Sequence, residues 1–83
     1  MDQVANSTEA LGRVIRDARK RMSLSQAALA SRVGVHQPTI SNIERGTKHT
    51  SVDTLLRLLA TLQLQFVIRD RGSEDLKTPW SED

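Results

Sequence analysis

The sequence contains no cysteine and no tyrosine, and it has only one tryptophan and one phenylalanine among 83 residues. Without cysteine, neither a disulfide framework nor a thiolate metal site can form, which fits a reducing cytoplasm. No apolar run approaches the roughly 20 residues that a membrane-spanning helix requires, and the N-terminus lacks the basic-then-apolar order of a signal peptide. We therefore expect one small domain in the cytoplasm, without a membrane partner.

The sequence also lacks the arrangements that mark enzymes. No serine lies in a strand–turn–helix elbow, no acid–base pair recurs at a telling spacing, and no glycine-rich phosphate loop occurs. His36 and His49 make no zinc site in the absence of cysteine. We expect a protein that is not an enzyme and that needs neither a cofactor nor a metal.

The small net charge of +2 hides an asymmetry along the chain. Between Ala10 and Arg69, ten Lys and Arg residues stand against three Asp and Glu residues, which gives +7. Both ends are acidic, with −2 over residues 1–9 and −3 over residues 70–83. A basic body with acidic ends suggests a polyanion-binding domain and a terminal segment of different purpose, although an ordinary charged surface gives the same counts.

Apolar residues at helical spacing predict four helices within residues 8–62. The first follows capping residues at positions 6–8, and Gly12 inside it predicts close packing against another element. The second begins after Ser25 and ends at Gly34, which can adopt a positive φ. The residues expected to face the core are Leu11, Val14, Ile15, Ala18 and Met22 in the first helix, and Leu29, Ala30 and Val33 in the second.

The limits of the third and fourth helices are predicted from the same kinds of residue. The third runs from about Gln37 to Arg45, since the missing N–H of Pro38 is tolerated in a first turn and Gly46 ends the helix. The fourth begins at Ser51. Their expected core residues are Ile40 and Ile43, and then Val52, Leu55, Leu56, Leu59 and Leu62.

Residues 25–46 read SQAALASRVGVHQPTISNIERG. Two short helices around a glycine turn form a helix-turn-helix arrangement. The stretch resembles the repressor-like helix-turn-helix family of the phage repressor and Cro type, and the resemblance extends over roughly residues 11–62. It implies an all-α, DNA-binding bundle of four helices. The matching positions are Gln26, Leu29, Ala30, Val33, Gly34, Val35, Gln37, Ile40, Ser41, Ile43, Glu44 and Gly46.

The exposed start of the third helix is the candidate for base reading. A major groove admits a helix, and the amide of Gln37 can match the donor and acceptor of an adenine. His36 either contacts a base or phosphate, or faces water as a poor cap. Pro38 occupies a position that often reads bases in the family, but it offers only apolar contact. The base-reading candidates are His36, Gln37, Pro38 and Thr39.

Short polar and cationic residues around this helix are candidates for phosphate contacts. Gln26 begins the second helix, whose N-terminal N–H groups suit a phosphate. In the family, the glutamine at this position also braces the one at Gln37. The resemblance further pairs Arg19 with Glu44, which we interpret as structural. The phosphate candidates are Gln26, Ser41, Asn42, Arg45, Thr47 and Lys48.

The stretch LQLQFVIRD, residues 62–70, alternates apolar and polar residues as a strand with one buried face does. No other strand is predicted, and a strand without a partner leaves its backbone unpaired. The simplest partner is the same strand of a second copy, antiparallel across a two-fold axis. We therefore predict a homodimer in which residues 63–70 pair and Leu64, Phe66 and Ile68 cover the helical cores.

A helical domain with such a strand and a short polar tail resembles the HipB-type antitoxins, the DNA-binding halves of HipA–HipB toxin–antitoxin modules. The resemblance implies binding to palindromic operators, repression of the chain's own operon and sequestration of a HipA-like kinase toxin. Alternatives are a stand-alone regulator, an antitoxin of another toxin family, and an interaction module of the same fold that binds no DNA. Residues 1–7 and the acidic tail, 71–83, are expected to be flexible, with Trp80 docking on the toxin.

Overall fold

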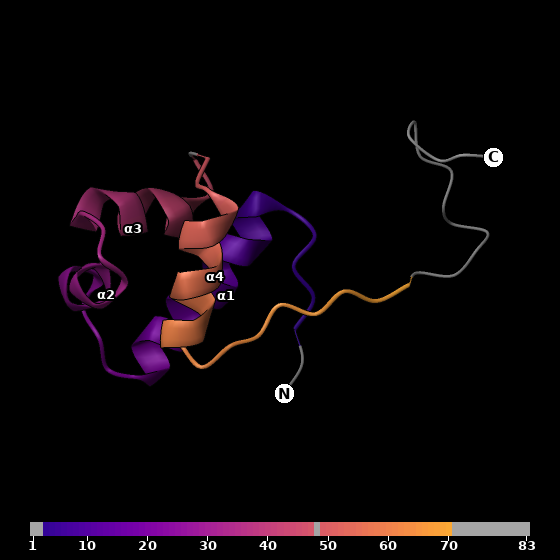
Figure 1. Ribbon diagram of the computed structural model, residues 1–83, viewed down its shortest axis with the longest axis horizontal. Coiled ribbons are helices and arrows are strands. Elements are labelled where there is room, and N and C mark those ends of the chain that lie inside the picture. Colours follow the sequence, from indigo (N-terminus) through magenta and orange to yellow (C-terminus); the bar gives the residue numbers. More distant parts are fainter. Residues whose placement is uncertain (1–2, 48, 71–83) are drawn as a thin grey trace.

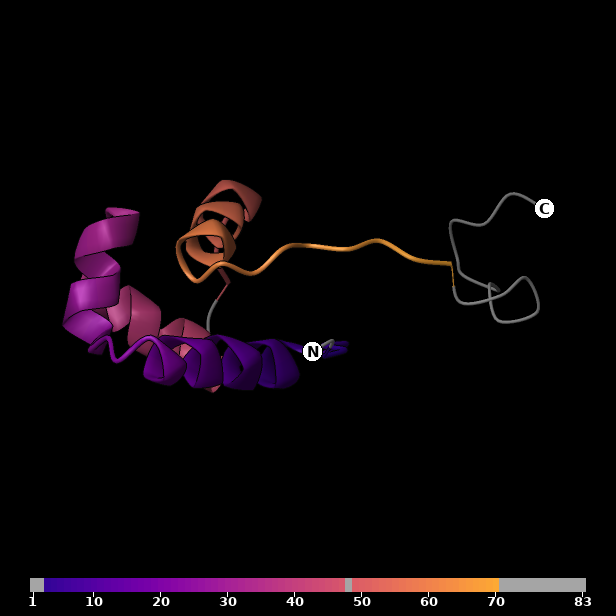
Figure 2. The same ribbon diagram turned by 90° about the horizontal axis from the view of Figure 1, so that it is seen from below.

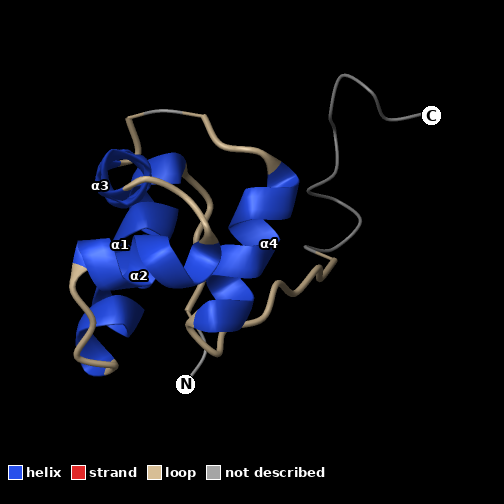
Figure 3. Cartoon of the chain, turned by 60° about the vertical axis from the view of Figure 1, so that its left-hand side comes forward, coloured by secondary structure: helices blue, strands red, loops and turns tan. Residues whose placement is uncertain are grey.

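The computed structural model describes residues 3–47 and 49–70 of the chain. Four helices follow one another and pack into a bundle (Figure 1), as the apolar spacing predicts. Within the described residues there is no strand (Figure 3), and no helix is long and apolar enough to cross a membrane. The helices are α1 (Thr8–Arg21), α2 (Gln26–Val33), α3 (Gln37–Arg45) and α4 (Val52–Thr61).

Serine begins three of the four helices. In each case the serine hydroxyl accepts a hydrogen bond, at 3.0 Å, from the backbone N–H three residues later. Such a cap satisfies one of the N–H groups that a helix leaves free at its start, and its loss costs about 1 kcal/mol. Helix α3 differs, because His36 precedes it and makes no side-chain cap. The three capping residues are Ser7, Ser25 and Ser51.

The helix ends use left-handed residues. Gly34 and Gly46 end α2 and α3 as predicted, and both have positive φ. Helices α1 and α4 end in the same way without glycine, because Ser23 and Gln63 adopt φ values of 57° and 60°. After Gln63, the N–H of Leu64 bonds back to α4 at 2.8 Å, which turns its side chain toward the core.

Each helix contributes one large, fully buried side chain to a single core. Completely burying such a side chain is worth about 1.5–3 kcal/mol, so the four together dominate the packing. Smaller buried residues and partly buried ones, including Leu11, Met22 and Leu64, surround them. The four are Ile15, Leu29, Ile40 and Leu58.

The core face of α4 differs in part from the predicted one, since Leu59 and Leu62 are buried and Leu55 is half-buried as predicted. Val52 and Leu56 are 71% and 47% exposed, whereas Leu58, which was not predicted to face inward, is completely buried. Positions 52, 56 and 59 and positions 55, 58 and 62 both have helical spacing, so periodicity alone does not choose between the two stripes. The packing of α4 turns the second stripe and Leu59 toward the core and leaves Val52 and Leu56 in solvent.

Helix α1 approaches the end of α3 very closely at Gly12, as predicted from a glycine within a helix. A Cβ atom at this position would lie 2.6 Å from the carbonyl oxygen of Ile43 and nearer still to that of Glu44. No side chain fits there without moving α3. The contact brings the buried faces of α1 and α3 together beside Glu44.

The segment after α4 runs away from the bundle as an extended chain (Figures 1 and 2). Leu64 is half-buried, but Phe66 and Ile68 are 59% and 87% exposed in the single chain. The predicted burial of these two residues is therefore absent within one copy. The strand pairing itself was expected from a second copy, and it stays a prediction.

Candidate nucleic-acid interface

The centre of the site is a buried ion pair between α1 and α3. Arg19 Nε donates to Glu44 Oε2 at 2.6 Å and Arg19 Nη2 donates to Glu44 Oε1 at 3.1 Å, a two-point contact that suits a guanidinium. The two side chains are only 11% and 4% exposed. The hydrogen bond to Glu44 raises the pKa of Arg19, against the opposing effect of burial, and the attraction between the charges raises it further.

Arg19 also holds the turn between α1 and α2. Its Nη1 donates to the carbonyl oxygen of Leu24 at 2.8 Å. The next residue, Ser25, caps α2, so the start of α2 is fixed relative to the ion pair. Among the described residues, no buried side-chain nitrogen or oxygen lacks a hydrogen-bond partner.

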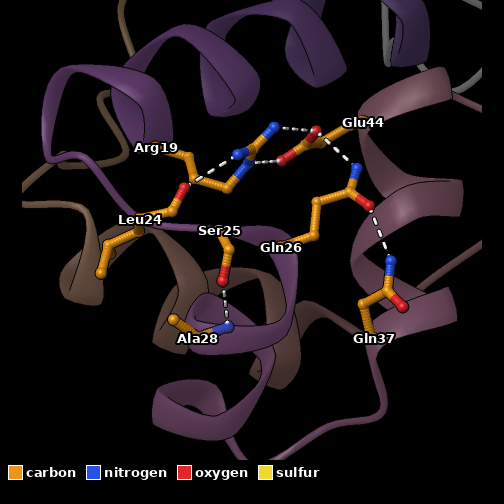
Figure 4. Close-up of polar contacts among 7 residues, drawn as sticks. All are labelled: Arg19, Leu24, Ser25, Gln26, Ala28, Gln37 and Glu44. Carbon is orange, nitrogen blue, oxygen red and sulfur yellow. Dashed lines mark hydrogen bonds and ion pairs between the residues drawn. The ribbon is translucent and has the colours of Figure 1, made fainter.

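Two glutamines continue the ion pair to the surface (Figure 4). Gln26 Nε2 donates to Glu44 Oε1 at 3.0 Å, and Gln37 Nε2 donates to Gln26 Oε1 at 2.8 Å. Gln26 is half-buried and Gln37 is exposed. We call Arg19, Glu44, Gln26 and Gln37 the polar relay. It connects three helices and ends at the first residue of α3.

The predicted base-reading residues lie at the start of α3. His36, Gln37 and Pro38 are exposed, and Thr39 is half-buried with its N–H bonded to the carbonyl oxygen of His36 at 2.9 Å. Of these residues, only Gln37 is held by a side-chain hydrogen bond to the rest of the fold. A held, exposed amide at a helix start can present a fixed pattern of donor and acceptor.

The predicted phosphate residues lie farther along α3 and in the loop after it. Arg45 is exposed, and its Nη2 donates to Asn42 Oδ1 at 2.7 Å. The backbone oxygen of Asn42 accepts hydrogen bonds from the N–H and, more weakly at 3.4 Å, the hydroxyl of Thr47. Ser41 is half-buried, and Lys48 lies outside the described residues. Cation, amide and hydroxyl thus gather at the C-terminal end of α3.

The family assignment rests on residues 15–68, which match a family model described as helix-turn-helix. The match covers α2, α3 and the turn between them, together with α4 and the C-terminal half of α1. The chain belongs to this helix-turn-helix family. Its Cro and phage-repressor type is a class of DNA-binding regulators and not a class of enzymes. The fold described above is thus that of a helix-turn-helix domain.

Several curated relatives share the helix-turn-helix domain. Two HipB antitoxins of Escherichia coli are 32% and 30% identical over 60 residues, which cover 72% of this chain and 64% and 68% of theirs. An uncharacterised regulator of Sinorhizobium fredii is 35% identical over 65 residues, 78% of this chain. The chain spans only 33% of that protein, and 16% of a regulator of Methanococcoides burtonii.

Solved structures of HipB are also similar to this helix-turn-helix chain. A HipB variant in complex with a 20-mer called O2 superposes with a TM-score of 0.76 and 29% identity, covering 87% of this chain and all of that one. A complex described as HipA-HipB-O2-O3 contains a chain with a TM-score of 0.75 and 28% identity. That likeness covers 86% of this chain and all of the matched one.

Two contacts of the helix-turn-helix domain were not predicted from the sequence. The first is the bond from Gln26 to Glu44, which joins a predicted structural pair to a predicted DNA contact. The second is Arg57, whose Nη1 donates to the carbonyl oxygen of Val33 at 2.9 Å and so holds the end of α2. An arginine facing the C-terminal end of another helix is favoured electrostatically, but sequence spacing does not show which helix it faces.

Proposed function

We propose that the chain is a sequence-specific DNA-binding repressor whose α3 enters the major groove with Gln37 toward the base edges. The observation that carries this proposal is the hydrogen bond from Gln37 to Gln26, which holds an exposed amide at the start of α3. The major groove distinguishes all four base pairs by their donors and acceptors, and a fixed amide is suited to adenine. Residues beside it, His36, Pro38 and Thr39, complete the proposed reading surface.

Phosphate contacts would orient the domain on the duplex. Gln26 at the start of α2 and the cluster of Ser41, Asn42, Arg45, Thr47 and Lys48 are the proposed ligands, because amides, hydroxyls, cations and helix starts supply most backbone contacts. The balance of +7 over residues 10–69 supports electrostatic attraction to DNA. These contacts position the protein, whereas sequence preference comes from the start of α3.

A randomised duplex library tests the proposal. The wild-type protein should enrich a defined sequence, and binding to random duplex should weaken steeply with salt, because each phosphate contact releases counterions. A protein-interaction module of the same fold would enrich no sequence and show weak salt dependence. The exposed amide of Gln37 within a basic body favours DNA binding over this second candidate.

The acting form in this proposal is a homodimer on a palindromic operator. Phe66, Val67 and Ile68 are exposed beside a groove of about 610 Å³ that Leu11, Leu59 and Leu64 help to line. Antiparallel pairing of residues 63–70 with a second copy would satisfy the backbone and cover these apolar groups. The two α3 helices would then meet half-sites about 34 Å apart.

Within this class we propose a HipB-type antitoxin that represses its own operon and neutralises a HipA-like kinase toxin. The similarity to HipB antitoxins supports this assignment, as does the likeness to a chain of a HipA–HipB complex. Trp80, which lies outside the described residues, is the proposed docking residue, because tryptophan is enriched at the centres of interfaces.

Calorimetry with a purified HipA-like kinase tests the antitoxin assignment. Truncation after Thr78 should leave operator binding intact and weaken kinase binding, because it removes Trp80. A stand-alone regulator would bind its operator and show no heat with the kinase. Equal kinase affinities of the full and truncated chains would remove Trp80 from the docking surface.

A further inference from the structure

The polar relay has a direction that its chemistry imposes. The carboxylate of Glu44 only accepts hydrogen bonds, so the half-buried amide of Gln26 meets it with Nε2. The carbonyl Oε1 of Gln26 is therefore turned toward α3, where it accepts from Gln37. If the amide of Gln26 turned over, its oxygen would face the carboxylate, and two acceptors would oppose each other without a proton between them.

This direction decides which hydrogen-bond donors and acceptors of Gln37 remain free for a base. A glutamine amide carries two Nε2 hydrogens and one acceptor oxygen, and one hydrogen is engaged with Gln26 at 2.8 Å. One donor and one acceptor remain. Adenine presents one acceptor, N7, and one donor, the N6 amino group, so the remainder fits it. Guanine presents two acceptors, N7 and O6, and would need both hydrogens of the amide.

We propose that Glu44, acting through Gln26, is a positioning residue for base specificity and makes Gln37 select adenine over guanine. The inference rests on the proposed DNA-binding function and deepens it. Glu44 touches no base in this scheme. It fixes the orientation of the Gln26 amide, and the oxygen of that amide then engages one of the two Nε2 hydrogens of Gln37. Arg19 supports the scheme because its two bonds hold the Glu44 carboxylate in place.

The test selects bound sequences from a randomised duplex library and compares base frequencies between variants. The wild type should select adenine at one position of each half-site, and Gln37→Ala should abolish the preference at that position alone. Gln26→Met keeps the length of the side chain and removes both bonds, so the ratio of adenine to guanine there should fall by roughly tenfold or more. Gln3→Met, the same change at an exposed glutamine of the N-terminal arm, should leave the ratio unchanged.

A second variant acts one residue farther from the DNA. In Glu44→Gln the new amide can donate as well as accept, so Gln26 is free to turn over and Gln37 can offer both hydrogens to a guanine. The adenine-to-guanine ratio should fall here too, while preferences at other positions persist. A purely structural role of Glu44 would instead weaken binding to all sequences equally. A thermal melt establishes folding, and if Glu44→Gln is unfolded, Gln26→Met decides alone.

The outcomes separate the two proposals. An unchanged ratio in Gln26→Met, or in folded Glu44→Gln, overturns the relay and leaves sequence-specific binding standing. Selection of a base other than adenine at the position lost in Gln37→Ala also overturns it. If the wild type enriches no sequence at all, the DNA-binding function fails, and the relay proposal fails with it.

Discussion

Two sides of the molecule differ in whether their groups find partners within a single chain. On the side of α1, α2 and α3, the charges of Arg19 and Glu44 are buried, and every buried polar side-chain atom among the described residues has a partner within the same chain. On the side of α4 and the segment after it, large apolar groups stay in solvent, among them Val52, Phe66 and Ile68. The polar groups of the first side are paired within one chain, whereas the apolar groups of the second side are where we propose that another copy binds.

This difference reflects two kinds of interaction. Buried charges must be paired, because an unpaired one costs several kcal/mol. The charges on the polar side therefore have to be paired within the single chain. Exposed apolar groups cost little in a single chain, and they stabilise an assembly when a partner removes them from water. The proposed reading surface is therefore preorganised, and the proposed association surface remains exposed in the single chain.

The largest expected effect is on the polar side. Glu44→Ala leaves the buried Arg19 guanidinium without an opposite charge and should reduce the free energy of unfolding by about 3–5 kcal/mol in urea titrations. The matched control is Asp53→Ala, which removes an ion pair on the surface. Arg57 Nε lies 3.3 Å from Asp53 Oδ2, and the two side chains are 51% and 83% exposed. The control should lose less than about 1 kcal/mol. Similar losses for both would contradict the comparison.

The next effect concerns association. Phe66→Asp places a charge where the second copy is expected and should weaken the dimer by at least about 2 kcal/mol, as replacement of a central aromatic residue does. Because Phe66 is 59% exposed in one copy, the fold of the monomer should be nearly unaffected. Sedimentation at several concentrations measures the dimer, and circular dichroism measures the fold. A wild-type chain that sediments as a monomer at all concentrations would refute strand pairing.

A smaller effect is expected at the end of the polar relay. Gln37→Ala should cost about 1–3 kcal/mol on the selected sequence and little on random duplex, because it removes a base contact. The unfolding free energy should stay within about 0.5 kcal/mol of the wild type, since the side chain is exposed. Fluorescence anisotropy with both duplexes measures the difference. Equal losses on both would identify Gln37 as a phosphate contact.

The smallest effect is expected at the other end of α3. Arg45→Ala should weaken binding to selected and random duplex alike and reduce the slope of log affinity against log salt by about 1. Lys48→Ala should behave in the same way. Titrations at several salt concentrations measure the slope. An unchanged slope would place the side chain away from the phosphates.

Much of the fold could be predicted because local chemistry determines it. The serine at position 51 and the glycines at positions 34 and 46 mark helix limits through interactions within a few residues. The core face of α4 could be predicted only in part: Leu59 and Leu62 are buried as expected, but spacing alone did not exclude Val52 and Leu56 or reveal Leu58, which the packing of the helix decides. The spacing of α2 and α3 reveals Gln37, but the link from Gln26 to Glu44 requires the positions of three helices.

The close contact at Gly12 also predicts where loss-of-function mutations should occur. A methyl group there would collide with the backbone of α3 at Ile43 and Glu44 and displace the helix end that carries the carboxylate. The displacement would reach Gln37 through the same bonds that orient it. A genetic screen for loss of the proposed repression should therefore recover alleles at codon 12, in the interior of the bundle, together with alleles at the codons for the proposed reading surface.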